Sequence, residues 1–265
     1  MRPSSNQTFS FPRFARLFGR HTAEHLPAYL MTAAVGLGLM FVVMGLLTYL
    51  QKSAPSVTAQ GIFFMLFLLA GGLVFASTVF AQFGERRRAS VALLLPASHF
   101  EKWLVAWLYS LPIFLLVFTP LFYLADAAVV HAGAAPGQAP EVVNIFAVAV
   151  RENIISVLWF LLLLNSVGLW GAIYFEKAHF IKTAFAVLLL MGVLSVLNHQ
   201  VLKVLVGSAD LRVAPPFTGV VFAQGQQFYT IGLPENQATW MAWVPVLLAG
   251  LLWVASYFRV TEKQL

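Results

Sequence analysis

Six stretches of the chain are long and apolar enough to cross a membrane as helices. They are residues 28–50, 61–83, 103–125, 154–174, 183–202 and 240–258. None of them contains Asp, Glu, Lys or Arg. Spanning a hydrocarbon core takes about 20 apolar helical residues, and a central charged residue would cost roughly 2.5–3.5 kcal/mol. The pattern therefore predicts an all-α integral membrane protein, with residues 1–265 forming a single transmembrane domain of six transmembrane helices.

The segment 1–27 before the first apolar stretch has a different pattern. Phe11, Phe14 and Phe18 recur at helical spacing, while Arg13 and Arg16 fall on another face. An apolar stripe opposite a basic face is typical of a helix that lies in the membrane interface. We therefore expect an N-terminal interfacial helix on the cytoplasmic side. A disordered basic tail is the alternative.

The connection 203–239 between the fifth and sixth apolar stretches is unusually apolar. Residues 201–206 and 217–222 are apolar runs too short to span, and Pro215-Pro216 separates them. Short apolar runs near a membrane favour re-entrant or interfacial helices backed by neighbouring protein. We expect short outer helices here that close the external face, with an ordinary exposed loop as the alternative.

Composition supports a membrane protein, and the distribution of charge orients it. The chain is 60% hydrophobic and 10% charged, whereas soluble domains have about 25% charged residues. It has no cysteine, which excludes disulfides and thiolate metal sites.

The net charge of +6 could indicate nucleic-acid binding, but 12 of the 16 basic residues fall on one side of the predicted topology. Since positive residues stay in the cytoplasm, both termini are expected there and no nucleic acid is expected as a partner. These 12 residues are Arg2, Arg13, Arg16, Arg20, Arg86, Arg87, Arg88, Lys102, Lys177, Lys182, Arg259 and Lys263.

The cytoplasmic loop 84–102 has the most specific pattern in the chain. Ser98 followed by Glu101 is a capping box, which predicts a helix beginning after Ser98. Pro96 prevents a preceding helix from running through. The apolar run Val91–Leu95 is left between a basic cluster and this helix start. An exposed apolar run framed by charge favours a docking site for a soluble partner, and packing at the level of the lipid headgroups is the alternative.

The run Leu94-Leu95-Pro96-Ala97-Ser98, with Glu101-Lys102 after it, resembles a signature of bacterial permeases of the type-2 class of ATP-binding-cassette (ABC) transporters. The layout over nearly the full chain is also similar to that class, which has an elbow helix, six spans, a coupling element after the second span and short outer helices between the fifth and sixth. The resemblance implies the membrane-spanning subunit of an exporter in a bacterial cytoplasmic (inner) membrane, working as a dimer with a second permease copy or homologue.

The resemblance also implies that loop 84–102 contacts a separate ATPase subunit, which binds ATP and Mg. The chain itself has no Gly-x-x-x-x-Gly-Lys-Ser/Thr motif, so we expect neither enzymatic activity nor a cofactor on this chain. The alternative is a non-transporting polytopic scaffold subunit of a membrane complex. The implied ATPase-coupling residues are Glu85, Arg86, Arg87, Arg88, Leu93, Leu94, Leu95, Pro96, Ser98 and Glu101.

Two further patterns are candidates for chemistry. Asn165 and Ser166 are polar residues inside the fourth apolar stretch, with Gly168 and Gly171 after them. They favour either close helix packing or a substrate path. His21, Glu24 and His25 fit His-x-x-Glu-His, a zinc-hydrolase pattern. That would make the chain an intramembrane hydrolase, but a lone five-residue pattern is weak, and no catalytic or metal-binding residue is predicted.

Overall fold

The computed structural model shows a mainly helical chain with one small sheet. It describes residues 9–84, 98–134, 141–144, 154–175, 178–206, 210–211, 220–224, 227–231 and 235–262. The helical elements are α1 (Phe11–Gln51), α2 (Val57–Gly84), α4 (His99–Leu108), the π-helical turn η1 (Tyr109–Ile113), α5 (Phe114–Gly133), α7 (Ile154–Tyr174), α8 (His179–Val206) and α9 (Glu235–Glu262). The strands are β1 (Asp210–Leu211), β2 (Val220–Gln224) and β3 (Gln227–Ile231).

Among the described residues, five helical stretches are long and apolar enough to cross a membrane. They lie in α1, in α2, in the continuous run from α4 through η1 to α5, in α8 and in α9. The described apolar stretch of α7, Leu158–Tyr174, is shorter. Five of the six apolar stretches lie inside a single α-helix, and residues 103–125 lie within the continuous run from α4 through η1 to α5. The hydrophobic pattern therefore located the helices correctly. The structure is compatible with a multi-pass membrane protein.

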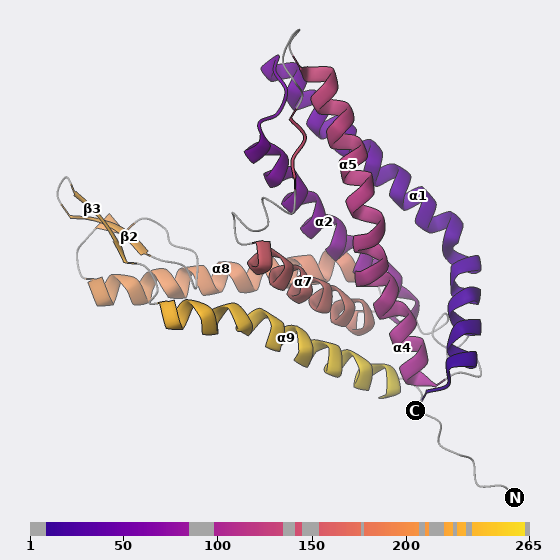
Figure 1. Cartoon of the computed structure of the whole chain (residues 1–265). Helices are drawn as coiled ribbons and strands as arrows, with labels where there is room; N and C mark the ends of the chain where they lie inside the picture. Colours follow the sequence, from indigo (N-terminus) through magenta and orange to yellow (C-terminus); the bar gives the residue numbers. More distant parts are fainter. Residues whose placement is uncertain are drawn as a thin grey trace, which may run out of the picture.

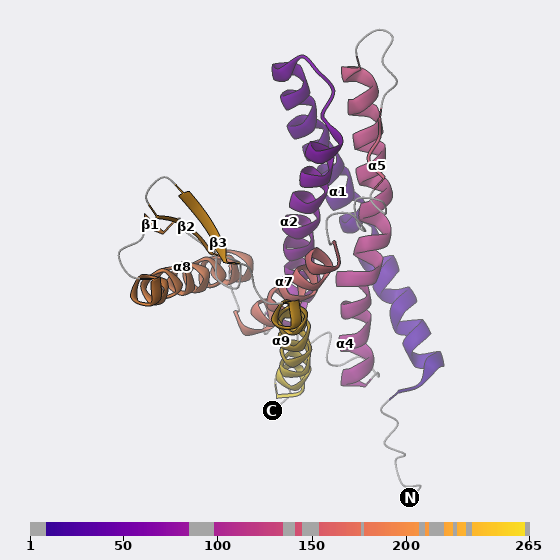
Figure 2. The same ribbon diagram turned by 60° about the vertical axis from the view of Figure 1, so that its left-hand side comes forward.

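The helices form two layers that cross. α2 and α5 run side by side, with α1 packed against α5 (Figure 2). α8 and α9 run across that direction in Figure 1, and α9 is seen nearly along its axis in Figure 2. α7 packs along both α2 and α9 and so joins the two layers. Spans of one bilayer usually tilt by only about 20° from the membrane normal. The described helices therefore do not form one parallel six-helix bundle, and α1, α2 and α5 are the helices that run as parallel spans would.

α1 is one continuous helix of 41 residues. The predicted interfacial helix forms its first turns and is not a separate element. α1 changes direction along its length (Figure 1), and Pro27, which lacks a backbone donor, lies within it. Phe14, Leu17 and Phe18 pack on a buried cluster of protein side chains, while Phe11 is exposed. Most of the apolar face that the sequence predicted to face lipid therefore contacts protein.

The short outer helices predicted in residues 203–239 are wrong for the described residues. Residues 201–206 are the last turns of α8, and Val220–Gln224 is a strand that pairs antiparallel with Gln227–Ile231. β1 pairs with the other edge of β2. The run Val220-Val221-Phe222 has the β-branched and aromatic residues that favour strands. The described part of the chain is therefore mainly helical with one small sheet, and residues 220–224 and 227–231 do not form the short helices expected to close the external face.

Two buried clusters form the core of the part of the chain that the structure describes. One lies between α1, α2 and α5 and contains Met44, Leu68 and Phe122, each fully buried. The other lies where α4 meets α2, α7, α9 and the start of α1, and contains Tyr109 and Ile173. This second cluster supports the candidate site described below, because the first turns of α1 and α4 are fixed on it.

Small residues let α7 approach its neighbours closely. A Cβ atom added at Gly168 would lie 3.3 Å from the Cβ atom of Ala76 in α2. A Cβ atom added at Gly171 would overlap the Thr183 side chain in α8 and lie 2.7 Å from its Cγ2 atom. Close contacts through small residues are the usual means by which apolar helices associate. Gly168 and Gly171 thus serve helix packing, one of the two roles that the sequence left open.

We predict that Gly171→Ala lowers the free energy of unfolding by about 1–3 kcal/mol, the usual cost of overpacking. Gly192→Ala in α8 is the matched control, because a Cβ atom there meets nothing within 4 Å. The control should be neutral or slightly stabilising, since Ala is the better helix former. Thermal unfolding in detergent measures both variants. In the Gly171→Ala background, Thr183→Ala should restore much of the lost free energy of unfolding, because it removes the side chain that the new Cβ atom overlaps. Equal unfolding temperatures for the two glycine variants would contradict the close approach of α7 and α8.

Candidate functional site at the start of α4

The capping box predicted from the sequence is present at the start of α4. The Glu101 N–H donates to Ser98 Oγ at 3.1 Å, and the Ser98 N–H donates to Glu101 Oε2 at 3.0 Å. Ser98 has an extended backbone and is the N-cap residue of α4. These reciprocal bonds satisfy two backbone donors that a helix N-terminus would otherwise leave without partners. The loop 84–102 therefore ends in a fixed geometry.

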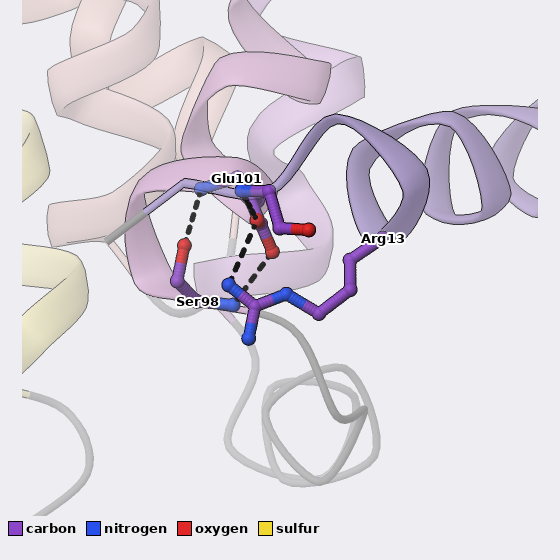
Figure 3. A network of polar contacts seen from close by, with 4 residues as sticks. Arg13, Ser98 and Glu101 are labelled. Carbon is purple, nitrogen blue, oxygen red and sulfur yellow. Dashed lines mark hydrogen bonds and ion pairs between the residues drawn. The ribbon is translucent and has the colours of Figure 1, made fainter. Parts of the chain in front are cut away.

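The same carboxylate also holds the first helix. Glu101 Oε1 accepts a hydrogen bond from the Ser10 N–H at 2.7 Å and one from Arg13 Nη2 at 3.2 Å. Figure 3 shows Arg13 extending from α1 toward the Glu101 carboxylate, where its guanidinium lies beside Ser98. Arg13 and Glu101 are 88 residues apart in the chain. We call Ser10, Arg13, Ser98 and Glu101 the Glu101 node.

The Glu101 side chain is fully buried, yet its environment favours the charged form. Burial alone would raise its pKa, but the N–H groups of Ser98 and Ser10 and the Arg13 guanidinium outweigh burial and lower the pKa of Glu101 below its usual value. Glu101 precedes the apolar stretch that begins at Trp103. The carboxylate also lies at the N-termini of both α1 and α4, where the helix dipoles stabilise negative charge. The node is therefore an anion held by two helix ends and one cation.

A polar and aromatic cluster lies on the next turns of α1. His21 Nε2 is 2.8 Å from Tyr29 Oη, and the His21 ring lies 4.8 Å from the Tyr109 ring of η1. Burial, with a smaller contribution from His25, lowers the pKa of His21 to about 4, so His21 is neutral at neutral pH. The cluster therefore packs α1 on η1 without adding a buried charge.

The zinc-hydrolase interpretation of His21, Glu24 and His25 has no support in this geometry. The two imidazole rings are stacked with centroids 4.3 Å apart, and His25 Nδ1 is 3.0 Å from the His21 carbonyl oxygen. Glu24 forms an exposed ion pair with Arg20 at 2.6 Å. Among the described residues, no group of three or more His, Cys, Asp or Glu side chains is placed to hold a metal ion.

Asn165 and Ser166 are both fully buried in α7, as helix packing requires. Asn165 Nδ2 donates to the Ser110 carbonyl oxygen of η1 at 3.0 Å, whereas Ser166 Oγ donates within its own helix to Leu163. In a regular α-helix the Phe114 N–H would donate to the Ser110 carbonyl oxygen. Here the Phe114 N–H donates to the Leu111 carbonyl oxygen instead. Asn165 thus supplies a donor to the π-helical turn that contains Pro112.

Most of the predicted coupling loop lies outside the described residues. Ser98 and Glu101 are described and meet in the node. Ser10 and Arg13 were missed as site residues because a single sequence carries no signal for a contact across 88 positions. The only local indication was the basic face of the first helix. The predicted loop residues outside the described part are Glu85, Arg86, Arg87, Arg88, Leu93, Leu94, Leu95 and Pro96.

Comparison of the chain with protein-family models, curated proteins and solved structures finds no match. A functional conclusion therefore depends on the residues and contacts described above.

We predict that Glu101→Ala lowers the free energy of unfolding by about 2 kcal/mol, because it leaves the Ser98 and Ser10 N–H groups without their acceptor. Glu262→Ala is the matched control, since it breaks the exposed Arg259–Glu262 pair, and such pairs contribute at most about 1 kcal/mol. Thermal unfolding measures both variants, and amide hydrogen exchange of residues 11–18 should accelerate only in Glu101→Ala. Equal losses in the two variants would contradict a structural role for the node.

The same carboxylate gives a pH dependence with a defined sign. Because the fold lowers the pKa of Glu101, the stabilisation by its ionised form is complete above the ordinary value of 4.5 and is lost as pH falls through the folded-state value. Glu101→Gln should remove this component from the pH profile of unfolding, whereas Glu262→Gln should leave it unchanged.

Proposed function

We propose that this chain is the membrane-spanning permease subunit of an ATP-driven exporter of the type-2 ABC class, with ATP hydrolysed by a separate subunit. The observation that carries the proposal is the Glu101 node. It ties the end of the loop with the Leu94-Leu95-Pro96-Ala97-Ser98-x-x-Glu101-Lys102 signature to the first turns of both α1 and α4.

The node gives this function a physical route. A soluble ATPase docked on residues 85–97 would push on a loop whose end is fixed at Ser98. Glu101 would transmit the displacement to α1 through Ser10 and Arg13 and to α4 through its own helix. Packed elements pass movement on because their interfaces deform little. In this proposal the substrate path forms between two permease copies, and Asn165 stabilises the packing of α7 on η1.

The proposed location is a bacterial cytoplasmic membrane with both termini inside. The apolar helices and the bias of 12 of the 16 basic residues toward one side support it. α8 and α9 run across α2 and α5 in Figure 1. The side of the membrane on which the ends of α7, α8 and α9 lie is therefore the part of the proposed topology that most needs a test.

Reporter fusions test this topology. We predict a cytoplasmic signal for fusions at both termini, in residues 85–97 and at Glu176-Lys177, because the positive residues gather there. With a cytoplasmic N-terminus, an external C-terminus would mean that the chain crosses the membrane an odd number of times. That result would contradict six spans.

The function is tested by the partner that copurifies with the chain in mild detergent. We predict that Leu93→Glu with Leu94→Glu weakens association with an ABC ATPase and its stimulation, while membrane insertion is retained. Phe180→Glu with Ile181→Glu is the matched control, because these exposed apolar residues start α8 on the other predicted cytoplasmic connection. Normal ATPase binding and stimulation by the Leu93 and Leu94 variant would show that this loop is not the coupling site.

A scaffold subunit of a membrane complex is the second candidate. The extensive exposed apolar surface of α8, which includes Leu188, Val196 and Val204, favours it because such a surface can pack against other membrane subunits. Copurification with membrane subunits and no ATPase would identify this role.

A further inference from the structure

A groove lies between the C-terminal ends of α1 and α5. In Figure 1 the C-terminal end of α1 lies far from its first turn, which the Glu101 node holds. Its volume is about 780 Å³, within the roughly 300–1,000 Å³ of small-molecule sites. Phe41, Gly45 and Thr48 line the α1 side, and Ala128 and Ala132 line the α5 side. Gly45 has open space where a Cβ atom would be. The lining is mainly apolar, so the groove is shaped for an alkyl chain.

A single cation lies among the lining residues at the end of α1. Lys52 is exposed, follows the last residue of α1 and has the left-handed backbone conformation with φ 53°. Within the described part of the chain, no carboxylate forms an ion pair with it. Ser53 and Tyr49 add hydroxyl groups to the lining. A positive charge and hydroxyl donors at the end of an apolar groove complement a phosphate attached to an alkyl chain.

The same end of the groove also carries negative partial charge. α1 ends at Gln51 and α5 ends at Gly133, so the last carbonyl groups of two helices gather near Lys52. Helix C-termini stabilise cations and hydrogen-bond donors. A headgroup with both a phosphate and a primary ammonium therefore matches this end of the groove better than one that carries only negative charge.

We propose that the groove binds one acyl chain of a zwitterionic aminophospholipid, with the lipid phosphate at Lys52 and the ammonium near the final carbonyls of α1 and α5. On the proposed topology this lipid belongs to the outer leaflet. A second copy of the chain is a poorer occupant, because a twofold contact through this groove would bring two Lys52 side chains together. The proposal stands whether or not the chain couples to an ATPase.

Photo-crosslinking tests the proposal in phosphatidylcholine nanodiscs that contain a small fraction of phosphatidylethanolamine with a diazirine on its acyl chain. Mass spectrometry should place more label on the groove residues of α1 and α5 than on the exposed α8 surface at Leu188 and Val196. Unlabelled phosphatidylethanolamine should compete more strongly than phosphatidylglycerol, and inorganic phosphate should not compete, because it lacks the chain.

Two pairs of variants separate the headgroup from the chain. Lys52→Ala should lower groove labelling about threefold, as expected for one partly exposed charge contact, and Lys203→Ala, which removes an exposed lysine from α8, should not. Gly45→Leu should lower labelling by filling the groove, while Gly192→Leu, also at a position open to a side chain, should not.

Any of three results would overturn the proposal. The first is equal labelling of the groove and of α8. The second is the same behaviour of Lys52→Ala and Lys203→Ala. The third is a dimer that Gly45→Leu converts to monomers, which would show that a second copy covers the groove.

Discussion

A carboxylate withdrawn from water needs donors on its oxygens, and Glu101 obtains them from two helices that are far apart in the chain. Its oxygens accept from Ser98 and Ser10 backbone N–H groups and from Arg13. Without these donors the buried charge would be strongly destabilising. The first turn of α1 must therefore lie against the first turn of α4. This contact places the first turns of α1 on the second buried cluster, where Phe14, Leu17 and Phe18 pack.

A similar need for partners explains the place of Asn165, a polar residue inside the apolar helix α7. Backbone groups in an apolar environment must be paired within the protein, and the π-helical turn at Pro112 disturbs the regular pairing of one helix. Asn165 supplies a donor to the Ser110 carbonyl there. Ser166, its neighbour, donates to the Leu163 carbonyl oxygen within α7. Of these two adjacent buried residues, Asn165 is thus the one that links helices.

Features set by residues close in sequence were predictable. The Ser98–Glu101 capping box, the apolar helices and the packing role of Gly168 and Gly171 each depend on short spacings or on residue type, and the structure contains all of them. The strands Val220–Gln224 and Gln227–Ile231 also had a local signal in the sequence, because a run rich in Val and Phe followed by a glycine, Gly225, is typical of strands and hairpins. It was missed because short apolar runs do not distinguish helix from strand by themselves.

Features set by distant residues were not predictable from one sequence. Nothing near Arg13 indicates Glu101 as its partner, and hydropathy gives the length of an apolar helix but not its direction. The crossing of α7, α8 and α9 over α2 and α5 depends on how α7 packs between α2 and α9. The apolar side chains of residues 11–18 likewise could have contacted either lipid or protein. They contact protein because the second buried cluster, which contains Tyr109, lies next to them in the fold.

α1 connects the two proposed sites. Its 41 residues correspond to a helix about 60 Å long at 1.5 Å per residue. The Glu101 node holds its first turn, and Lys52 follows its last residue at the groove. Hydrogen bonds along the helix resist local stretching, so a displacement of the first turn has to be absorbed at the bend or passed to the far end. Pro27 removes one of those hydrogen bonds. The bend in α1 is therefore where the fold can decouple the node from the groove, and its stiffness determines how far a movement at Glu101 reaches.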